Sequence, residues 1–112
     1  MNKSYIPGAG DIVLVHVEPR APGVAPRPKP ALVLSPSAYN KKTGLMVCCP
    51  VTTHIKGYPF EVLIDTTPDQ AVLADQIKTL DWANGRISRE ARINSAELAE
   101  VRAKLHALIL KN

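Results

Sequence analysis

Short apolar runs recur along most of this chain, and polar or proline-rich segments separate them. The runs hold four to eight residues each and are rich in β-branched and aliphatic side chains, which is typical of buried strands. They span residues 11–18, 31–34, 45–51, 60–64, 71–74 and 77–82. Strands at such short intervals predict a compact antiparallel barrel, because closure hides the hydrogen-bonding edges that an open sheet exposes.

Two segments between these runs have a different character. Residues 19–30 contain five prolines, which exclude both a helix and a central strand and predict an extended, partly mobile loop. Residues 37–44 are polar and end in Gly44, so we expect a turn or a short helical piece there.

The hydrophobic period changes near the C-terminus. Aliphatic residues recur there at helical spacing, at Leu98, Val101, Leu105, Leu108 and Ile109. Asn94 is followed three residues later by Glu97, which resembles a capping box. The pattern predicts a helix from about residue 95 to 109 that covers one face of the barrel.

Composition adds a size and a charge to this picture. The 112 residues form a single domain (1–112), and 46% of them are apolar, as expected of a folded protein. Fourteen basic and ten acidic side chains give a net charge of +4 and a pI near 9.3, which favours RNA, DNA or an acidic protein segment as partner. An ordinary basic domain would carry the same charge.

Cysteine content and the N-terminus indicate the compartment. Cys48 and Cys49 are the only cysteines. Neighbours in a strand point to opposite faces, so we expect two reduced, buried or nearly buried thiols and a cytoplasmic protein. Two thiols are too few for a structural zinc site. The N-terminus lacks the apolar core of a signal peptide, and no run is long enough to span a membrane. We expect neither a metal nor a cofactor.

The segment from Pro50 to Val62 carries the clearest candidate chemistry. Thr52, Thr53, His54 and Lys56 place two hydroxyls, an imidazole and an ammonium within five positions after an apolar run. These groups can hold and polarise a phosphodiester, and the end of a strand gives them rigid support. A solvated polar loop is the alternative reading of the same residues.

Six short motifs together resemble the MazF/PemK toxins of bacterial toxin–antitoxin pairs. In order along the chain they are Gly10–Val13, Pro30–Pro36, Tyr39–Asn40, Pro50–Thr53, Lys56–Val62 and Leu73–Lys78. The likeness runs from about residue 5 to the C-terminal helix.

The resemblance implies a mostly β fold with α: an SH3-like antiparallel β-barrel, MazF/CcdB-like, with a C-terminal α-helix, assembled as a homodimer. It implies an mRNA interferase, that is, a sequence-specific, metal-independent endoribonuclease that cuts single-stranded RNA and leaves 2′,3′-cyclic phosphate and 5′-hydroxyl ends. It further implies a cognate antitoxin whose disordered acidic segment covers the RNA groove.

The family's catalytic pair can be carried over to this chain residue by residue. The threonine falls on Thr52, which we expect to orient a non-bridging phosphate oxygen. The family's arginine, just before the proline of the second strand, is replaced by Lys29, while Arg27 lies two residues earlier. Either can supply the cation. A lysine lacks the planar fork of an arginine but is the better proton donor.

Histidines and further polar residues extend the candidate site. His54 lies two residues from Thr52 and is either an acid or base of the reaction or a solvated loop residue. RNA contacts are expected from Lys56 and Lys78 to phosphates and from Asn40, Thr53 and Gln76 to base edges. Aromatic residues make up only 4% of the chain, so recognition is expected to use hydrogen bonds more than stacking.

The remaining ring side chains are expected to be structural. His16 is predicted in the core or an interface and His106 in solvent, and Trp82 and Phe60 in the core or dimer interface.

Two other functions fit the same fold. The chain could be a catalytically weakened homologue that binds RNA or antitoxin without cutting, or a gyrase-inhibiting toxin that binds a protein.

Overall fold

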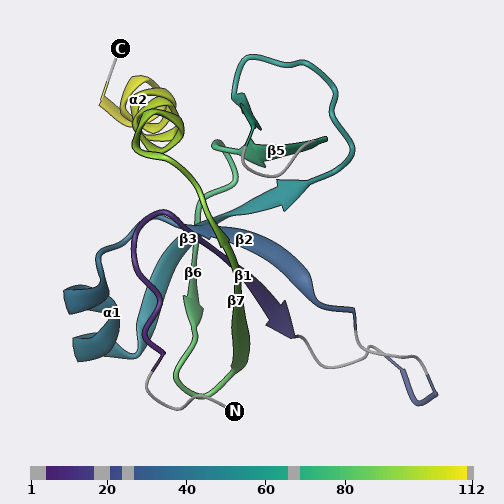
Figure 1. Cartoon of the computed structure of the whole chain (residues 1–112), viewed down its shortest axis with the longest axis vertical. Helices are drawn as coiled ribbons and strands as arrows, with labels where there is room; N and C mark the ends of the chain where they lie inside the picture. Colours follow the sequence, from purple (N-terminus) through teal and green to yellow (C-terminus); the bar gives the residue numbers. More distant parts are fainter. Residues whose placement is uncertain (1–4, 17–20, 24–26, 66–68, 111–112) are drawn as a thin grey trace.

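The computed structural model describes residues 5–16, 21–23, 27–65 and 69–110 (Figure 1). In chain order its elements are β1 (Asp11–His16), β2 (Lys29–Val33), α1 (Ser37–Thr43), β3 (Leu45–Thr52), β4 (Glu61–Ile64), β5 (Gln70–Leu73), β6 (Lys78–Asp81), β7 (Arg86–Arg92) and α2 (Ser95–Leu110). The predicted strands and the C-terminal helix are confirmed. The end of the first predicted strand, residues 17 and 18, lies outside the described residues.

All strand pairs of the sheet are antiparallel, and β3 lies at its centre. It pairs with β2 along one edge and with both β6 and β5 along the other. On the β2 side, β1 pairs with β2, and β7 pairs with β1. The mostly β, barrel-like fold is therefore confirmed. Closure is not complete, because β6 and β7 form no pair with each other in the described part of the chain.

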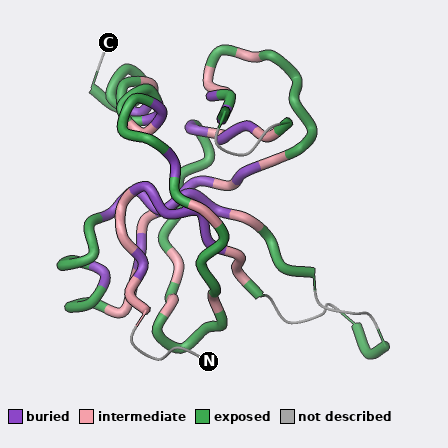
Figure 2. Tube along the Cα trace, viewed as in Figure 1, coloured by how far each residue is buried: buried purple, intermediate pink, exposed green. Residues whose placement is uncertain are grey.

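The two faces of the central strands pack two separate apolar clusters. The first cluster joins these strands to β4, β5 and α2 through residues such as Leu32, Cys49 and Val62. The second consists of Val13, Ala31, Val33, Met46 and Cys48 on the opposite face. Figure 2 shows the buried stretches concentrated where β1, β2 and β3 cross the middle of the molecule.

The two cysteines follow this division of faces, as predicted. Cys48 belongs to the second cluster and Cys49 to the first, and both are free thiols with no exposed surface. Burial raises the pKa of Cys48 to about 11 and that of Cys49 to about 12. Both thiols are therefore protonated and unreactive near neutral pH.

Helix α2 begins with the capping box predicted from the sequence. The Glu97 backbone N–H donates to Asn94 Oδ1 over 2.8 Å, and the Asn94 N–H donates to Glu97 Oε1 over 3.1 Å. Val101 and Leu105 then pack into the first cluster. The last two residues of the predicted apolar stripe are not buried: Leu108 is 46% exposed and Ile109 62%.

Three details differ from the sequence-based expectations. Lys29 and Pro30, assigned to the proline-rich loop, belong to β2, where Pro30 lies opposite Leu14. Strand β7 was not predicted, because its exposed positions are mostly arginine, serine and glutamate. His16 is exposed at the end of β1, so of its two predicted locations, core or interface, the core is wrong. The short helical piece expected at residues 37–44 is confirmed as α1, which Gly44 closes in the left-handed conformation that glycine favours (φ 74°).

Other side chains lie as expected. Trp82 packs against the second cluster and its Nε1–H donates to the backbone oxygen of Asn40 over 3.0 Å. His106 is exposed on α2. None of the helices in the described ranges is long and apolar enough to cross a membrane.

Candidate functional site

Strands β2 and β3 bring the two central candidates, Lys29 and Thr52, to the same face of the sheet. Their register pairs Val33 with Cys48 and Ala31 with Pro50. The pairing ends there; Lys29 and Thr52 lie two residues further along their strands, and Thr52 pairs with Ala71 of β5. Residues two apart in a strand point to the same face, so Lys29 shares the face of Ala31, and Thr52 that of Pro50. Because Val33, Ala31 and Cys48 belong to the second cluster, this is the face of the second cluster.

Thr52 lines a cavity of about 200 Å³ that we call the polar cavity. Its other lining residues come from the loop after β3, from β4, from the end of β5 and from the β5–β6 connection: His54, Lys56, Tyr58, Glu61, Leu73 and Gln76. The structure thus gathers four residues that the sequence analysis named, namely Thr52, His54, Lys56 and Gln76.

The Thr52 hydroxyl has a defined orientation in the polar cavity. Its oxygen accepts a hydrogen bond from the His54 backbone N–H over 3.0 Å. The hydroxyl proton is not used in that bond, so it can donate to an anionic ligand. This geometry suits a threonine that binds a phosphate oxygen. The exposed side chain of His54 lies two residues further along the chain.

Residues 53–60 form a loop beside the polar cavity, and Glu61 holds its backbone. The Glu61 carboxylate accepts hydrogen bonds from the N–H groups of Lys56 (2.9 Å) and Gly57 (2.6 Å). Gly57 adopts a φ of 79°, which strains other residues. The hydroxyl of Tyr58 donates to Asp75 Oδ1 over 2.6 Å, and this bond is the main reason why the Tyr58 pKa rises to about 12.

Lys29 and Lys78 line a second cavity of about 190 Å³, which we call the apolar cavity. The rest of its lining comes from β1, β2, β3 and β6 and is aliphatic or proline: Val15, Pro30, Ala31, Pro50, Val51 and Leu80. Both lysines are exposed. Thr52 lines the polar cavity and Lys29 the apolar cavity; the two cavities share no lining residue, but Val51 of the apolar cavity directly precedes Thr52 of the polar cavity.

Three predicted residues lie apart from the cavities. Arg27 is exposed and precedes β2, and Thr53 is exposed beside Thr52; neither lines the polar or the apolar cavity. Asn40 has no exposed surface at all. The prediction that Asn40 reads a base edge therefore does not fit the structure.

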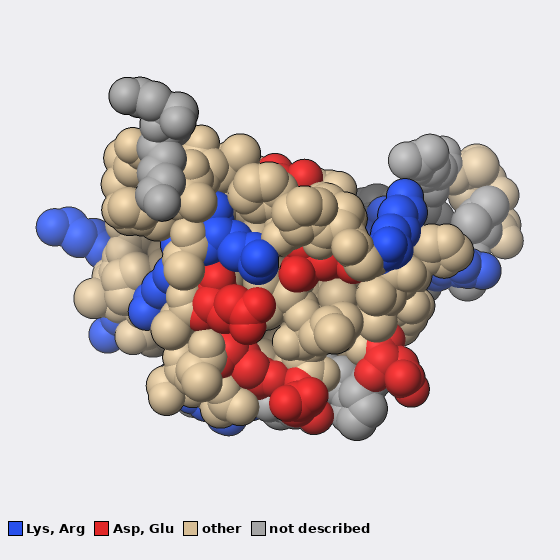
Figure 3. All heavy atoms as spheres, turned by 90° about the horizontal axis from the view of Figure 1, so that it is seen from above, with Lys and Arg blue, Asp and Glu red and all other residues tan. Residues whose placement is uncertain are grey.

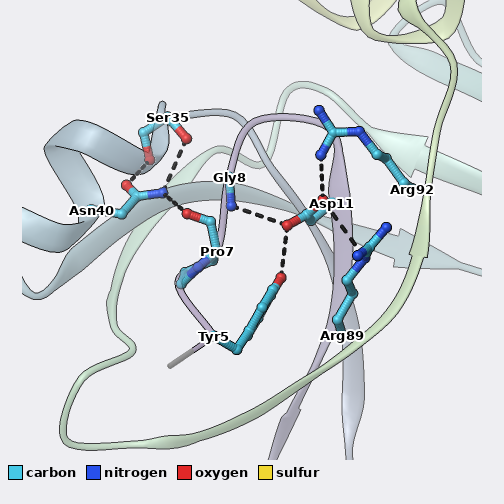
Figure 4. Close-up of polar contacts among 8 residues, drawn as sticks. All are labelled: Tyr5, Pro7, Gly8, Asp11, Ser35, Asn40, Arg89 and Arg92. Atoms are coloured by element: carbon cyan, nitrogen blue, oxygen red, sulfur yellow. Dashed lines mark hydrogen bonds and ion pairs between the residues drawn. The ribbon is translucent and has the colours of Figure 1, made fainter. Parts of the chain in front are cut away.

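The Asn40 side chain instead joins three parts of the fold (Figure 4). Its Nδ2 donates to the backbone oxygens of Pro7 (2.7 Å) and Ser35 (3.0 Å), and its Oδ1 accepts from Ser35 Oγ (2.5 Å). These bonds occupy the amide fully enough to explain why a polar side chain is buried here.

Figure 4 also shows a second polar cluster, around Asp11, that the sequence did not reveal. The buried Asp11 carboxylate accepts from the Tyr5 hydroxyl (2.8 Å) and the Gly8 N–H (3.1 Å), and it pairs with Arg92 (2.7 Å) and Arg89 (4.0 Å). Burial and the bond to Asp11 raise the pKa of Tyr5. The cluster connects the segment before β1 to β7. Arg89 and Arg92 therefore have a structural partner, Asp11.

Charge is unevenly distributed over the molecule. On the face shown in Figure 3, acidic side chains gather over the middle and lower part, and lysines and arginines stand mainly to either side. Within the described ranges, no three His, Cys, Asp or Glu side chains are grouped so that they could hold a metal ion.

Comparison with known proteins gives a consistent result. Residues 9–109 match the family model of the "PemK-like, MazF-like toxin of type II toxin-antitoxin system". The chain is 38% identical over 110 residues to the endoribonuclease toxin MazF of Escherichia coli (strain K12), covering 97% of this chain and 99% of that protein.

Solved structures agree with the sequence comparison. The crystal structure of MazE–MazF (Form II) from Deinococcus radiodurans matches with a TM-score of 0.87 and 44% identity, over 97% of this chain and 100% of that chain. An endoribonuclease from a mycobacterial species matches with a TM-score of 0.76 over 96% of both chains, and its 22% identity supports the fold alone.

Proposed function

We propose, from the premise that this chain belongs to the PemK-like, MazF-like toxins of type II toxin–antitoxin systems, that RNA is cut at the border of its two cavities. The chain is an endoribonuclease toxin of this family. The observation that supports the proposed site is that Lys29 and Thr52 each lie two residues beyond the paired residues Ala31 and Pro50, on the same face of the neighbouring strands β2 and β3.

The proposed reaction is an attack of a ribose 2′-hydroxyl on the adjacent phosphorus. The bond from phosphorus to the 5′-oxygen breaks, and the products are a 2′,3′-cyclic phosphate and a 5′-hydroxyl. No metal ion is required. Negative charge builds up on the non-bridging oxygens, where Lys29 supplies a cation and the Thr52 hydroxyl donates a hydrogen bond.

Two protons must move in this reaction. One leaves the 2′-hydroxyl and one reaches the 5′-oxygen. We assign the first transfer to His54, whose imidazole is exposed on the loop of the polar cavity, because a neutral imidazole is a suitable base near pH 7. We assign the second to Lys29, an ammonium that can donate its proton where an arginine would not.

Binding of the RNA strand uses both cavities. We propose that Lys56 and Lys78 contact phosphates and that Gln76 reads a base edge in the polar cavity. Thr53, exposed at the mouth of the loop, adds a hydrogen bond to a base. Single-stranded RNA fits this surface because its bases are free to turn into a cavity.

The proposed partners follow from the same surface. A cognate antitoxin with a disordered acidic segment would cover the lysines and so block RNA. The protein would act as a homodimer in the cytoplasm, where mRNA and antitoxin are found.

Cleavage of a long RNA by the purified protein in EDTA tests this function. We expect cuts at one short recurring sequence, with cyclic phosphate ends. Thr52→Ala and Lys29→Ala should each lower the rate by about 10²–10³, the usual effect of removing one group that stabilises the transition state. Lys29→Arg should lose less activity than Lys29→Ala, because it keeps the cation but not the proton donor. Normal cutting by Lys29→Ala together with loss in Arg27→Ala would transfer the cation's role to Arg27.

The same assay separates the other candidate functions and the role of the histidine. RNA binding without cuts would indicate a weakened homologue, and inhibition of DNA supercoiling would indicate a gyrase inhibitor. An unchanged rate–pH profile in His54→Ala would remove His54 from the mechanism.

A further inference from the structure

The Tyr58–Asp75 hydrogen bond connects two walls of the polar cavity. Tyr58 belongs to the loop of residues 53–60, and Asp75 belongs to the β5–β6 connection. Tyr58 Oη and Asp75 Oδ1 lie 2.6 Å apart, although the two residues are 17 positions apart in the sequence. A charge-assisted bond of this length is strong for its kind.

Each wall carries a group that is proposed to bind RNA. Lys56 lies two residues before Tyr58, and Gln76 follows Asp75 directly. Lys56 and Gln76 both line the polar cavity. The hydrogen bond therefore ties the phosphate-binding wall to the base-reading wall.

Other hydrogen bonds hold the ends of the loop and of the β5–β6 connection together, or hold the loop to itself. The Ala74 N–H donates to the Phe60 oxygen over 3.0 Å, and Glu61 accepts from the loop's own backbone. Tyr58 provides the side-chain link from the loop to the β5–β6 connection: its hydroxyl bonds to Asp75 and also interacts with the side chain of Gln76. Loss of the Tyr58 hydroxyl would therefore free the tip of the loop from this wall.

We propose that Tyr58 and Asp75 are a pair of positioning residues for RNA binding. Their hydrogen bond sets the separation of Lys56 from Gln76, and so determines how well the cavity fits a nucleotide next to the cleaved bond. Thr52 and Lys29 lie on strands outside this connection, and His54, at the start of the loop, is held to Thr52 by its own backbone hydrogen bond. The pair therefore acts on substrate binding and leaves the chemical step largely unchanged. The inference rests on the function proposed above.

A double-mutant cycle of Tyr58→Phe and Asp75→Ala tests the pair. We expect each single variant to raise KM about tenfold, the effect of losing one hydrogen bond to a charged group, with kcat within about twofold. The double variant should be no worse than Tyr58→Phe alone, because Asp75→Ala removes a bond that Tyr58→Phe has already removed. Asp75→Asn should restore much of the KM, since its amide oxygen still accepts from Tyr58.

Controls separate this effect from a loss of fold. Tyr39→Phe removes the hydroxyl of a partly exposed tyrosine on α1, away from both cavities, and should leave KM unchanged. All variants should unfold at the wild-type temperature within a few degrees. Additive effects in the double variant, or a fall in kcat at constant KM, would overturn the inference.

A binding measurement keeps the inference distinct from the proposed function. The probe is the cleaved RNA sequence with a 2′-deoxyribose at the cut, which cannot react. If the wild type binds this RNA but Tyr58→Phe binds equally well, the positioning role is wrong. If the wild type neither cuts RNA nor binds the probe, the proposed function itself fails.

Discussion

At the scale of single residues, Asn40 and Gln76 show how the fold gives similar side chains different roles. Both have an amide that can recognise a base, and both were candidates on chemistry alone. Asn40 is fully buried and bonded to Pro7 and Ser35, whereas Gln76 is exposed at the polar cavity. Substitution of Asn40 should therefore affect stability, whereas substitution of Gln76 should affect RNA recognition.

We predict that Asn40→Ala lowers the free energy of unfolding by about 2–4 kcal/mol, because it removes three hydrogen bonds and leaves buried partners unsatisfied. Gln76→Ala, the matched control, should change stability by less than about 0.5 kcal/mol but alter the preferred RNA sequence. Urea unfolding and mapping of cut sites measure the two effects. A stable Asn40→Ala variant with altered sequence preference would restore Asn40 to the binding site.

At the scale of secondary structure, the start of α2 links the helix to the sheet. Glu97 is 8% exposed and completes the capping box with Asn94, and its Oε2 also accepts from the Asp65 N–H over 2.6 Å, just after β4. One carboxylate therefore satisfies backbone donors in two segments. The capping box predicted from the sequence has a tertiary partner that the sequence did not show.

We predict that Asn94→Ala costs about 1 kcal/mol of stability, the usual loss for an N-cap residue, and that Asn94→Asp preserves it. Glu97→Ala should cost more, about 2–3 kcal/mol, because it leaves the N–H groups of both Asn94 and Asp65 without the carboxylate. Urea unfolding measures all three variants. Equal losses for Asn94→Ala and Glu97→Ala would show that the Asp65 contact adds nothing.

At the scale of the whole molecule, the structure shows where basic side chains that contribute to the net charge of +4 lie. Lys29, Lys56 and Lys78 line the two cavities, while Arg89 and Arg92 pair with Asp11. Basic groups near the proposed phosphate path should therefore release counterions when RNA binds, and those on distant elements should not.

We predict that Lys78→Gln reduces the salt dependence of RNA binding by about 0.7 in the slope of log K against log salt, the loss of one phosphate contact on a single strand. Lys41→Gln, which removes an exposed charge on α1, is the matched control and should leave the slope unchanged. Titrations of the uncleavable RNA at several salt concentrations provide the measurement. Equal slopes for both variants would place the phosphate path away from Lys78.

The sequence predicted those elements whose hydrophobic pattern is strong. The aliphatic runs of the central strands and the helical spacing from Leu98 to Leu105 each gave the correct element. Strand β7 was missed because Arg86, Ser88 and Glu90 face solvent, so only its pairing with β1 identifies it as a strand. The Tyr58–Asp75 contact was missed for a related reason, since nothing local marks two residues 17 positions apart as neighbours.

The sequence by itself determined which segments extend or coil, the presence of a basic surplus, and the residue types of a phosphate-binding loop, because these depend on local periodicity and on side-chain chemistry. Only the tertiary structure decided that Lys29 belongs to the strand beside β3, that Asn40 is buried, and that Asp75 reaches the loop. Strand register and the packing of distant segments set those relations, and both depend on contacts between residues that are far apart in the chain.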